Sequence, residues 1–119
     1  MAERSVVALG AVNAALAVAA GAFATHGLRA RLEPRALEIF ETGARYHMYH
    51  ALAMILAGVL ATRGAATAGW IFQAGIVVFS GSLYALAVTD LKWLGAITPV
   101  GGLAFLVGWA WLAWSAWRG

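Results

Sequence analysis

The chain has 119 residues, of which 63% are hydrophobic and only 11% are charged, and it contains no cysteine. Soluble domains carry about 45–50% apolar and about 25% charged residues, so a soluble chain of this composition would expose large apolar patches to water. The missing cysteines exclude disulfides, thiolate metal sites and cysteine nucleophiles. The net charge of +3 does not indicate nucleic-acid binding, because the basic residues lie at the ends of apolar segments, where they face lipid headgroups. We therefore expect no nucleic-acid partner.

Four long windows hold none of the eight Lys/Arg or five Asp/Glu residues: Ser5–Thr25, Tyr46–Thr62, Gly64–Thr89 and Trp93–Trp117. A helix needs about 20 apolar residues to cross the hydrocarbon core, and only helices satisfy the backbone of such segments in lipid. The pattern predicts an all-α, integral membrane four-helix bundle. We expect one transmembrane domain over residues 1–119, with spans at about 5–25, 46–63, 67–89 and 97–117.

The first span is rich in Ala and Gly and holds one polar side chain, Asn13. Small residues of this kind allow neighbouring helices to approach closely in a membrane. The apolar run Val6–Phe23 is long for the central region of a signal peptide, so we expect a retained span.

The segment 34–45 is amphipathic. Glu38, Glu41 and Arg45 recur at spacings of three and four, while apolar side chains take another face. This pattern predicts a short interfacial amphipathic helix between spans one and two, which turns near Gly43 into the second span. Glu41 precedes Arg45 by four residues, the orientation that favours an ion pair on a helix.

The start of the fourth span has two interpretations. Thr98 is a suitable N-cap and Pro99 suits the first helical position, so we expect a helix from about residue 98 and an interfacial connector over 91–97. The alternative is a longer helix from Trp93 that is kinked at Pro99.

Four spans place both termini and the turn at Arg63 on one side of the membrane. That side holds three basic residues and the opposite side holds five, namely Arg29, Arg31, Arg35, Arg45 and Lys92. The positive-inside rule then predicts that the amphipathic segment is cytoplasmic and that both termini are outside.

Polar side chains gather on the amphipathic side of the predicted bundle: His26, Arg45, Tyr46, His47, His50, Ser80, Ser82 and Tyr84. Three functional interpretations follow. His26, His47 and His50 could hold a metal ion, two histidines could ligate a haem, or the set could form a pocket for a quinone or lipid headgroup. The other interpretation is that these residues are interfacial anchors and interhelical hydrogen-bonding groups.

No predicted span carries Asp, Glu, Lys or Arg in its interior, which disfavours a proton-coupled transporter. A small channel would need a polar path through Asn13, Gln73 and Ser80. No pattern predicts catalytic residues, an enzyme activity or a cofactor. We expect a structural or accessory helix bundle that contacts membrane lipids, and other membrane proteins or copies of itself.

Four strings in this order and spacing resemble the YgdD/YwdK family of small integral membrane proteins (domain of unknown function 423): Gly21–Leu28, Thr42–Ala53, Phe79–Tyr84 and Trp93–Gly102. The family has animal relatives resembling transmembrane protein 256. The resemblance implies a multi-pass protein of the bacterial inner membrane with four spans, and it supplies no ligand or catalytic residues. Ala24 stands where the family pattern has glycine, which affects packing near His26.

Overall fold

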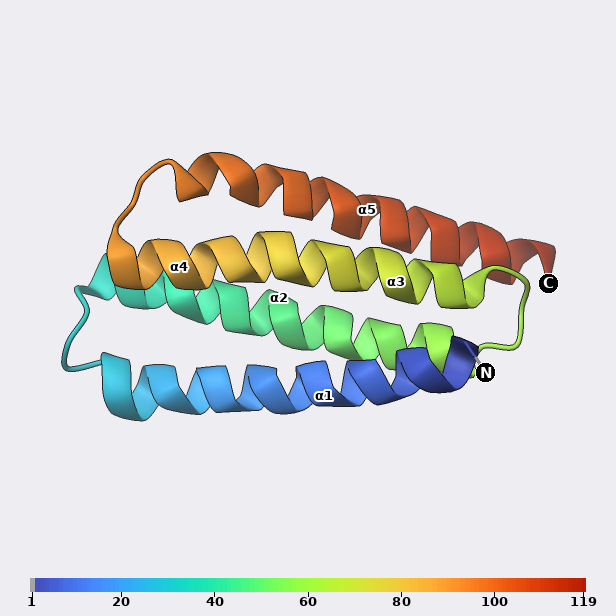
Figure 1. Cartoon of the computed structure of the whole chain (residues 1–119), viewed down its shortest axis with the longest axis horizontal. Coiled ribbons are helices and arrows are strands. Elements are labelled where there is room, and N and C mark those ends of the chain that lie inside the picture. Colours follow the sequence, from blue (N-terminus) through green and yellow to red (C-terminus); the bar gives the residue numbers. More distant parts are fainter. Residues whose placement is uncertain (1) are drawn as a thin grey trace.

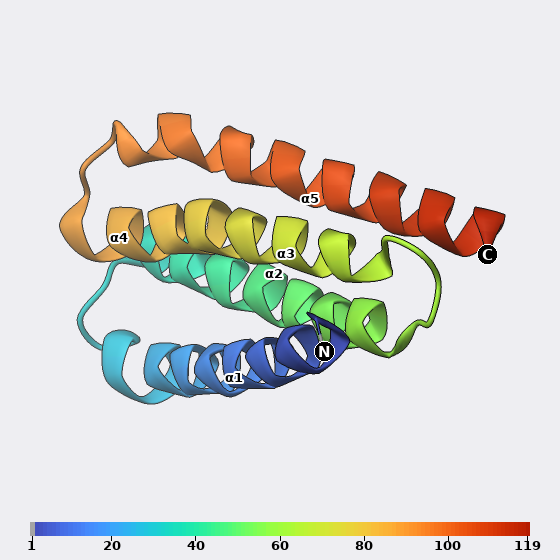
Figure 2. The ribbon, with the colours of Figure 1, turned by 45° about the vertical axis from the view of Figure 1, so that its right-hand side comes forward.

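The computed structural model describes residues 2–119 as four helical rods (Figure 1). Helix α1 (Ala2–Phe23) continues into a π-helical turn, η1 (Ala24–Leu28), and α2 (Pro34–Val59) returns beside it. The third rod comprises α3 (Ala65–Gly75), a second π-helical turn, η2 (Ile76–Ser80), and α4 (Gly81–Thr89). Helix α5 (Leu94–Arg118) is the last. The rods lie side by side in an elongated molecule of 48 × 26 × 18 Å (Figures 1 and 2).

Within residues 2–119, three segments are long and apolar enough to cross a membrane: Glu3–Leu28, Ala65–Thr89 and Leu94–Arg118, with mean hydropathies of 2.1, 1.8 and 1.6. Helix α2 is not among these segments, because its first half carries charged residues. Because α1 and α3 run in the same direction, α2 has to cross the same layer to connect them (Figure 1). The all-α membrane four-helix bundle is confirmed.

The amphipathic segment differs from the prediction, because it is not a separate helix. Residues 34–59 form one uninterrupted helix of 26 residues, about 39 Å long. Gly43 makes no turn there. A Cβ at this position would lie 3.0 Å from the ring of Tyr84, so Gly43 serves the contact between α2 and α4. The second helix therefore begins at Pro34 and ends at Val59, before the expected residue 63.

The expected start of the fourth helix at Thr98 was wrong, because α5 begins at Leu94 and holds Pro99 inside it. Backbone N–H groups of Leu94, Gly95 and Ala96 bond the carbonyls three residues earlier, at 3.0 to 3.1 Å. These bonds satisfy the first turn and start the helix ahead of the proline. The Thr98 hydroxyl bonds the Leu94 carbonyl within the helix and caps nothing (3.3 Å).

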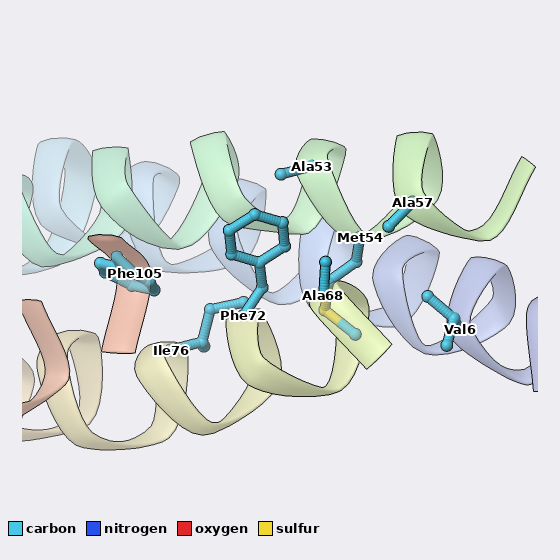
Figure 3. Close-up of a cluster of buried hydrophobic side chains, with 8 residues drawn as sticks. All are labelled: Val6, Ala53, Met54, Ala57, Ala68, Phe72, Ile76 and Phe105. Carbon is cyan, nitrogen blue, oxygen red and sulfur yellow. The ribbon is translucent and has the colours of Figure 1, made fainter. Parts of the chain in front are cut away.

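The largest core cluster lies between α1, α2, α3 and α5, and Phe72 stands at its centre (Figure 3). Phe72 and Met54 are fully buried there. The cluster consists of Val6, Ala53, Met54, Ala57, Ala68, Phe72, Ile76 and Phe105. Because lipid is as apolar as these side chains, close packing rather than exclusion of water holds such a core together.

Glycines allow the helices to touch. A Cβ at Gly69 of α3 would lie 2.4 Å from Val6 of α1, and one at Gly101 of α5 would lie 2.3 Å from the backbone nitrogen of Phe79. Both distances are shorter than any real carbon contact. Helix α5 therefore rests its backbone directly on η2, and α1 rests on α3.

Candidate polar network and aromatic groove

Four buried or half-buried polar side chains form one hydrogen-bonded chain through the bundle. The ring of His47 (α2) bonds the hydroxyl of Tyr84 (α4) through Nδ1 at 2.9 Å and Oδ1 of Asn13 (α1) through Nε2 at 3.0 Å. Asn13 Nδ2 donates in turn to Oε1 of Gln73 (α3) at 2.7 Å. This polar network (Asn13, His47, Gln73 and Tyr84) joins three of the four rods.

The groups that can only accept a hydrogen bond determine which atom donates in each bond of this network. Asn13 Nδ2 also donates to the Leu9 carbonyl at 2.9 Å, so its Oδ1 is the atom that faces His47. An amide oxygen only accepts, and His47 therefore carries a proton on Nε2. In the neutral ring Nδ1 is then the acceptor, and the Tyr84 hydroxyl donates to it.

His50 is held in the opposite way. The indole Nε1–H of Trp109 donates to His50 Nε2 at 3.0 Å, and an indole nitrogen only donates. The proton of the neutral ring is therefore on Nδ1, which donates to the Tyr46 carbonyl at 2.7 Å. The His50 ring also stacks on Phe105, with the ring centroids 3.5 Å apart and the planes 5° apart.

Both histidines lie near the middle of α2 rather than at its end. The predicted span over residues 46–63 would put both at the start of the second helix, but the helix begins thirteen residues before His47, at Pro34. Both are buried, at 6% and 4% exposure. In a spanning helix of this length, the middle lies in the hydrocarbon layer, where unbonded polar groups are costly.

The predicted metal and haem sites do not assemble. His26 is exposed in η1, away from the buried pair, and no three His, Cys, Asp or Glu side chains within residues 2–119 are grouped to hold a metal ion. Both ring nitrogens of His47 and of His50 are already bonded. A metal or a haem iron would have to displace those partners.

The two candidate serines serve helix packing. Ser80 is fully buried and its hydroxyl donates to the Gly43 carbonyl at 2.8 Å, which ties η2 to α2. Ser82 bonds the Thr98 hydroxyl at 2.6 Å and donates to the Phe79 carbonyl, so it ties α4 to α5. At the opposite end of the bundle, Ser115 plays the same part.

The predicted ion pair between Glu41 and Arg45 is absent. Among the described residues, the one ion pair is between Lys92 and Asp90, at 2.8 Å. The Arg45 guanidinium instead donates to the Thr42 hydroxyl at 3.1 Å. Glu41 and Arg45 both line a groove of about 310 Å³ between α1 and α2, which is separate from the polar network.

Tyr46 and His50 line a different hollow, the aromatic groove, which opens between α2, η2 and α5. Its volume is about 390 Å³, and its walls are almost entirely apolar. Phe79, Gly102, Phe105, Leu106, Trp109 and Tyr49 complete the lining. The candidate residues thus separate into a buried network, an aromatic groove, a lateral groove and an exposed histidine, and they form no single pocket.

Sequence reasoning did not associate Asn13, Gln73 or Trp109 with the histidines. The available signal was that Asn13 and Gln73 are the two amide side chains of the sequence and that both lie within uncharged segments. Such side chains seek partners on neighbouring helices in lipid. Only the unbroken course of α2 from Pro34 places His47 at the same depth in the bundle as Asn13 and Gln73.

The sequence profile of the family described as "Protein of unknown function (DUF423)" matches residues 20–102. The UPF0382 membrane protein YwdK of Bacillus subtilis is 50% identical over 108 residues, which covers 87% of this chain and 88% of YwdK. The UPF0382 membrane protein SAB0533 of Staphylococcus aureus is 45% identical over 106 residues, with 87% of each chain covered. No solved structure matches the chain.

Proposed function

This chain belongs to the DUF423 family of membrane proteins, and we propose that it acts as a structural or accessory helix bundle through contacts with lipids and neighbouring proteins. One observation carries the proposal: the buried polar groups are bonded to one another. Within residues 2–119, no buried side-chain nitrogen or oxygen lacks a hydrogen-bond partner. Groups that serve catalysis or transport need a substrate within reach, whereas these groups hold helices together.

The polar network supports this role because it joins segments that are distant in the sequence. His47 is 34 residues from Asn13 and 37 from Tyr84, and Gln73 is 60 from Asn13. In a membrane each such bond contributes about 0.6 kcal/mol on average, and it also selects one arrangement of the helices. The outer surfaces are then the part of the molecule that is free to bind partners.

Composition analysis of the purified protein tests this proposal. We expect neither a metal nor a chromophore at one per chain, by elemental analysis and absorption spectroscopy, and we expect His47→Ala to lower the unfolding temperature. A metal or cofactor at unit occupancy that is lost in His47→Ala, but retained in the exposed control His26→Ala, would contradict the proposal.

We also propose the inner membrane as the location, with the α1–α2 connection in the cytoplasm. The support is that four basic residues, Arg29, Arg31, Arg35 and Lys92, lie at that end of the bundle, against Arg4, Arg63 and Arg118 at the other, while Arg45 lies near the middle of α2. Because the chain has no cysteine, a single introduced thiol is a unique label. In intact cells, an impermeant maleimide should label Ala61→Cys and spare Ala30→Cys, whose sites are exposed at opposite ends of the bundle. The reverse pattern would overturn the orientation.

A second candidate function is binding of a ring-bearing apolar molecule, such as a quinone, in the aromatic groove. The observation that favours it is a ready-made stack: His50 lies flat on Phe105, and Tyr46 lies 4.9 Å from Phe79 between ring centroids. Apolar hollows of about 300–1,000 Å³ are typical of small-molecule sites.

Leu106→Trp places a larger side chain in the groove and tests this candidate. The matched control is Leu103→Trp, on the same helix and exposed to a similar degree, but outside the groove lining. The readout is the quenching of tryptophan fluorescence by a short-chain quinone added to the protein in nanodiscs. If the groove binds the quinone, this quenching should be at least several-fold weaker in Leu106→Trp than in the wild type, and unchanged in Leu103→Trp. Equal quenching of both variants would exclude the groove.

A further inference from the structure

A third hollow lies at the end of the bundle where the α1–α2 connection meets the last turn of α4. Its volume is about 590 Å³, larger than that of the aromatic groove. Three segments build it: the connection around Arg31, the first turns of α2 around Arg35, and the end of α4 with Lys92 beyond it. We call it the basic end groove. The apolar segments α1–η1 and α3–η2–α4 end here, at Leu28 and Thr89, so the groove lies at the level of the lipid headgroups.

Positive charge at the rim of this groove is incompletely neutralised. Arg31 and Arg35 are exposed, and neither guanidinium group has a hydrogen bond or ion pair among the residues that the structure describes. Asp90 is paired with Lys92, which leaves Glu33 as the one unpaired carboxylate of the lining. Two guanidinium groups therefore face the groove against one free carboxylate.

The backbone adds to this charge. Helix α2 starts at Pro34, and no side chain caps its first turn, since Glu33 forms no capping hydrogen bond. The N-terminus of a long helix carries a partial positive charge and unbonded N–H groups, which attract anions. The guanidiniums and the helix start thus act in the same direction.

The floor of the groove is apolar. The apolar part of the lining consists of Leu32, Ile39, Leu86, Ala87 and the more exposed Val88. Ala87 also belongs to the second core cluster, with Leu28 and Phe40, and Leu32 and Ile39 pack against that cluster. A ligand for this groove therefore needs a negatively charged head and an apolar body.

We propose that the basic end groove binds the headgroup of an anionic phospholipid, with Arg31 and Arg35 on the phosphate and the glycerol end of the acyl chains on the apolar floor. Planar guanidinium groups bind phosphate oxygens in pairs, and basic hollows between membrane helices are suited to anionic headgroups. The inference rests on the proposed function in lipid contacts, and it assigns those contacts to one place and one lipid class.

Native mass spectrometry of the intact protein, released from nanodiscs of phosphatidylglycerol and phosphatidylcholine, tests the proposal. The test variant is Arg31→Gln/Arg35→Gln. Its control, Arg4→Gln/Arg63→Gln, removes the same charge at the opposite end of the bundle. We expect the wild type and the control to retain phosphatidylglycerol over phosphatidylcholine, and the test variant to lose at least tenfold of that preference. Circular dichroism and gel filtration establish that each variant is folded.

Three outcomes would overturn the proposal: equal retention by the two charge variants, no preference for phosphatidylglycerol in the wild type, or displacement of the lipid by inorganic phosphate at millimolar concentration. The last would assign the groove to a free anion. None of these results contradicts the wider proposal of a non-catalytic bundle, which fails instead if a metal or cofactor at unit occupancy is lost in His47→Ala and retained in His26→Ala.

Discussion

Asn13 and His47 are joined by a hydrogen bond of 3.0 Å between Oδ1 and Nε2, although 34 residues separate them in the chain. The bond links α1 to α2 near the middle of α2. Asn13 is 5% exposed and His47 is 6% exposed, so neither group can turn to water for a partner. Each of the two helices therefore supplies the partner that the other needs.

Replacing Asn13 by Leu should destabilise the bundle. The change keeps a similar volume but leaves His47 Nε2–H and Gln73 Oε1 without their partner, so we expect a loss on the order of 1–2 kcal/mol. Denaturant unfolding in detergent micelles measures it. Val12→Leu, at the neighbouring exposed position, is the control and should leave the stability unchanged. Equal stability of both variants would show that the network contributes nothing.

The two buried histidines should be neutral and in opposite tautomers. His47 carries its proton on Nε2 because it faces an amide oxygen, and His50 carries its proton on Nδ1 because it accepts from Trp109. Solid-state nitrogen NMR of labelled protein in lipid distinguishes the two forms. Trp109→Phe should change the His50 signals and leave those of His47 in place. Identical tautomers in both rings would contradict the assigned bonds.

Gly101→Ala should be far more harmful than Gly102→Ala. A Cβ at Gly101 would lie 2.3 Å from the Phe79 backbone nitrogen, whereas one at Gly102 would meet its nearest atom at 3.8 Å. Overpacking of this kind costs about 1–3 kcal/mol, because α5 has to move off η2. Thermal unfolding of the two variants side by side measures the difference. Comparable melting temperatures would mean that α5 does not rest on η2 in the membrane.

Ser115→Ala should loosen the connection between α2 and α3. The Ser115 hydroxyl donates to the Arg63 carbonyl at 2.6 Å and bonds the Thr62 hydroxyl at 2.9 Å, and its side chain is fully buried. We expect faster amide exchange over residues 60–64 and unchanged exchange in the middle of α2. Hydrogen-exchange mass spectrometry resolves both regions. Ala116→Ser, at the exposed next position, serves as the control.

The membrane bundle could be predicted from the sequence because the hydrocarbon layer imposes a strong requirement, long uncharged segments. The boundaries of α2 could not, since Glu38, Glu41 and Arg45 interrupt the apolar pattern that marks a span. In the structure this charged stretch is simply the first half of a continuous helix. The sequence left two starts open for α5, and the structure matches the longer helix rather than the preferred start at Thr98, because bonds to the carbonyls of residues 91–93 begin the helix before Pro99.

The candidate site was predicted in part. The polar character of His47, His50 and Tyr84 allowed four interpretations: a metal site, a haem site, a quinone or lipid pocket, and interhelical hydrogen bonds. The structure shows the hydrogen bonds. Their partners were not predictable from spacing, because Asn13, Gln73 and Trp109 come from other helices and their levels depend on how the rods are staggered. The prediction that three histidines lie close together was wrong, because His26 is exposed at the end of the first rod whereas His47 and His50 are buried.

Because the rings of His47 and His50 have different hydrogen-bond partners, a second proton would affect them differently. His47 faces an amide oxygen and a phenol oxygen, both able to accept, so an imidazolium there would keep both contacts after a mere rotation of the Tyr84 hydroxyl. His50 faces the indole of Trp109, which has nothing to accept with. Charging that second ring would set two N–H groups against each other, and the wall of the aromatic groove would have to open.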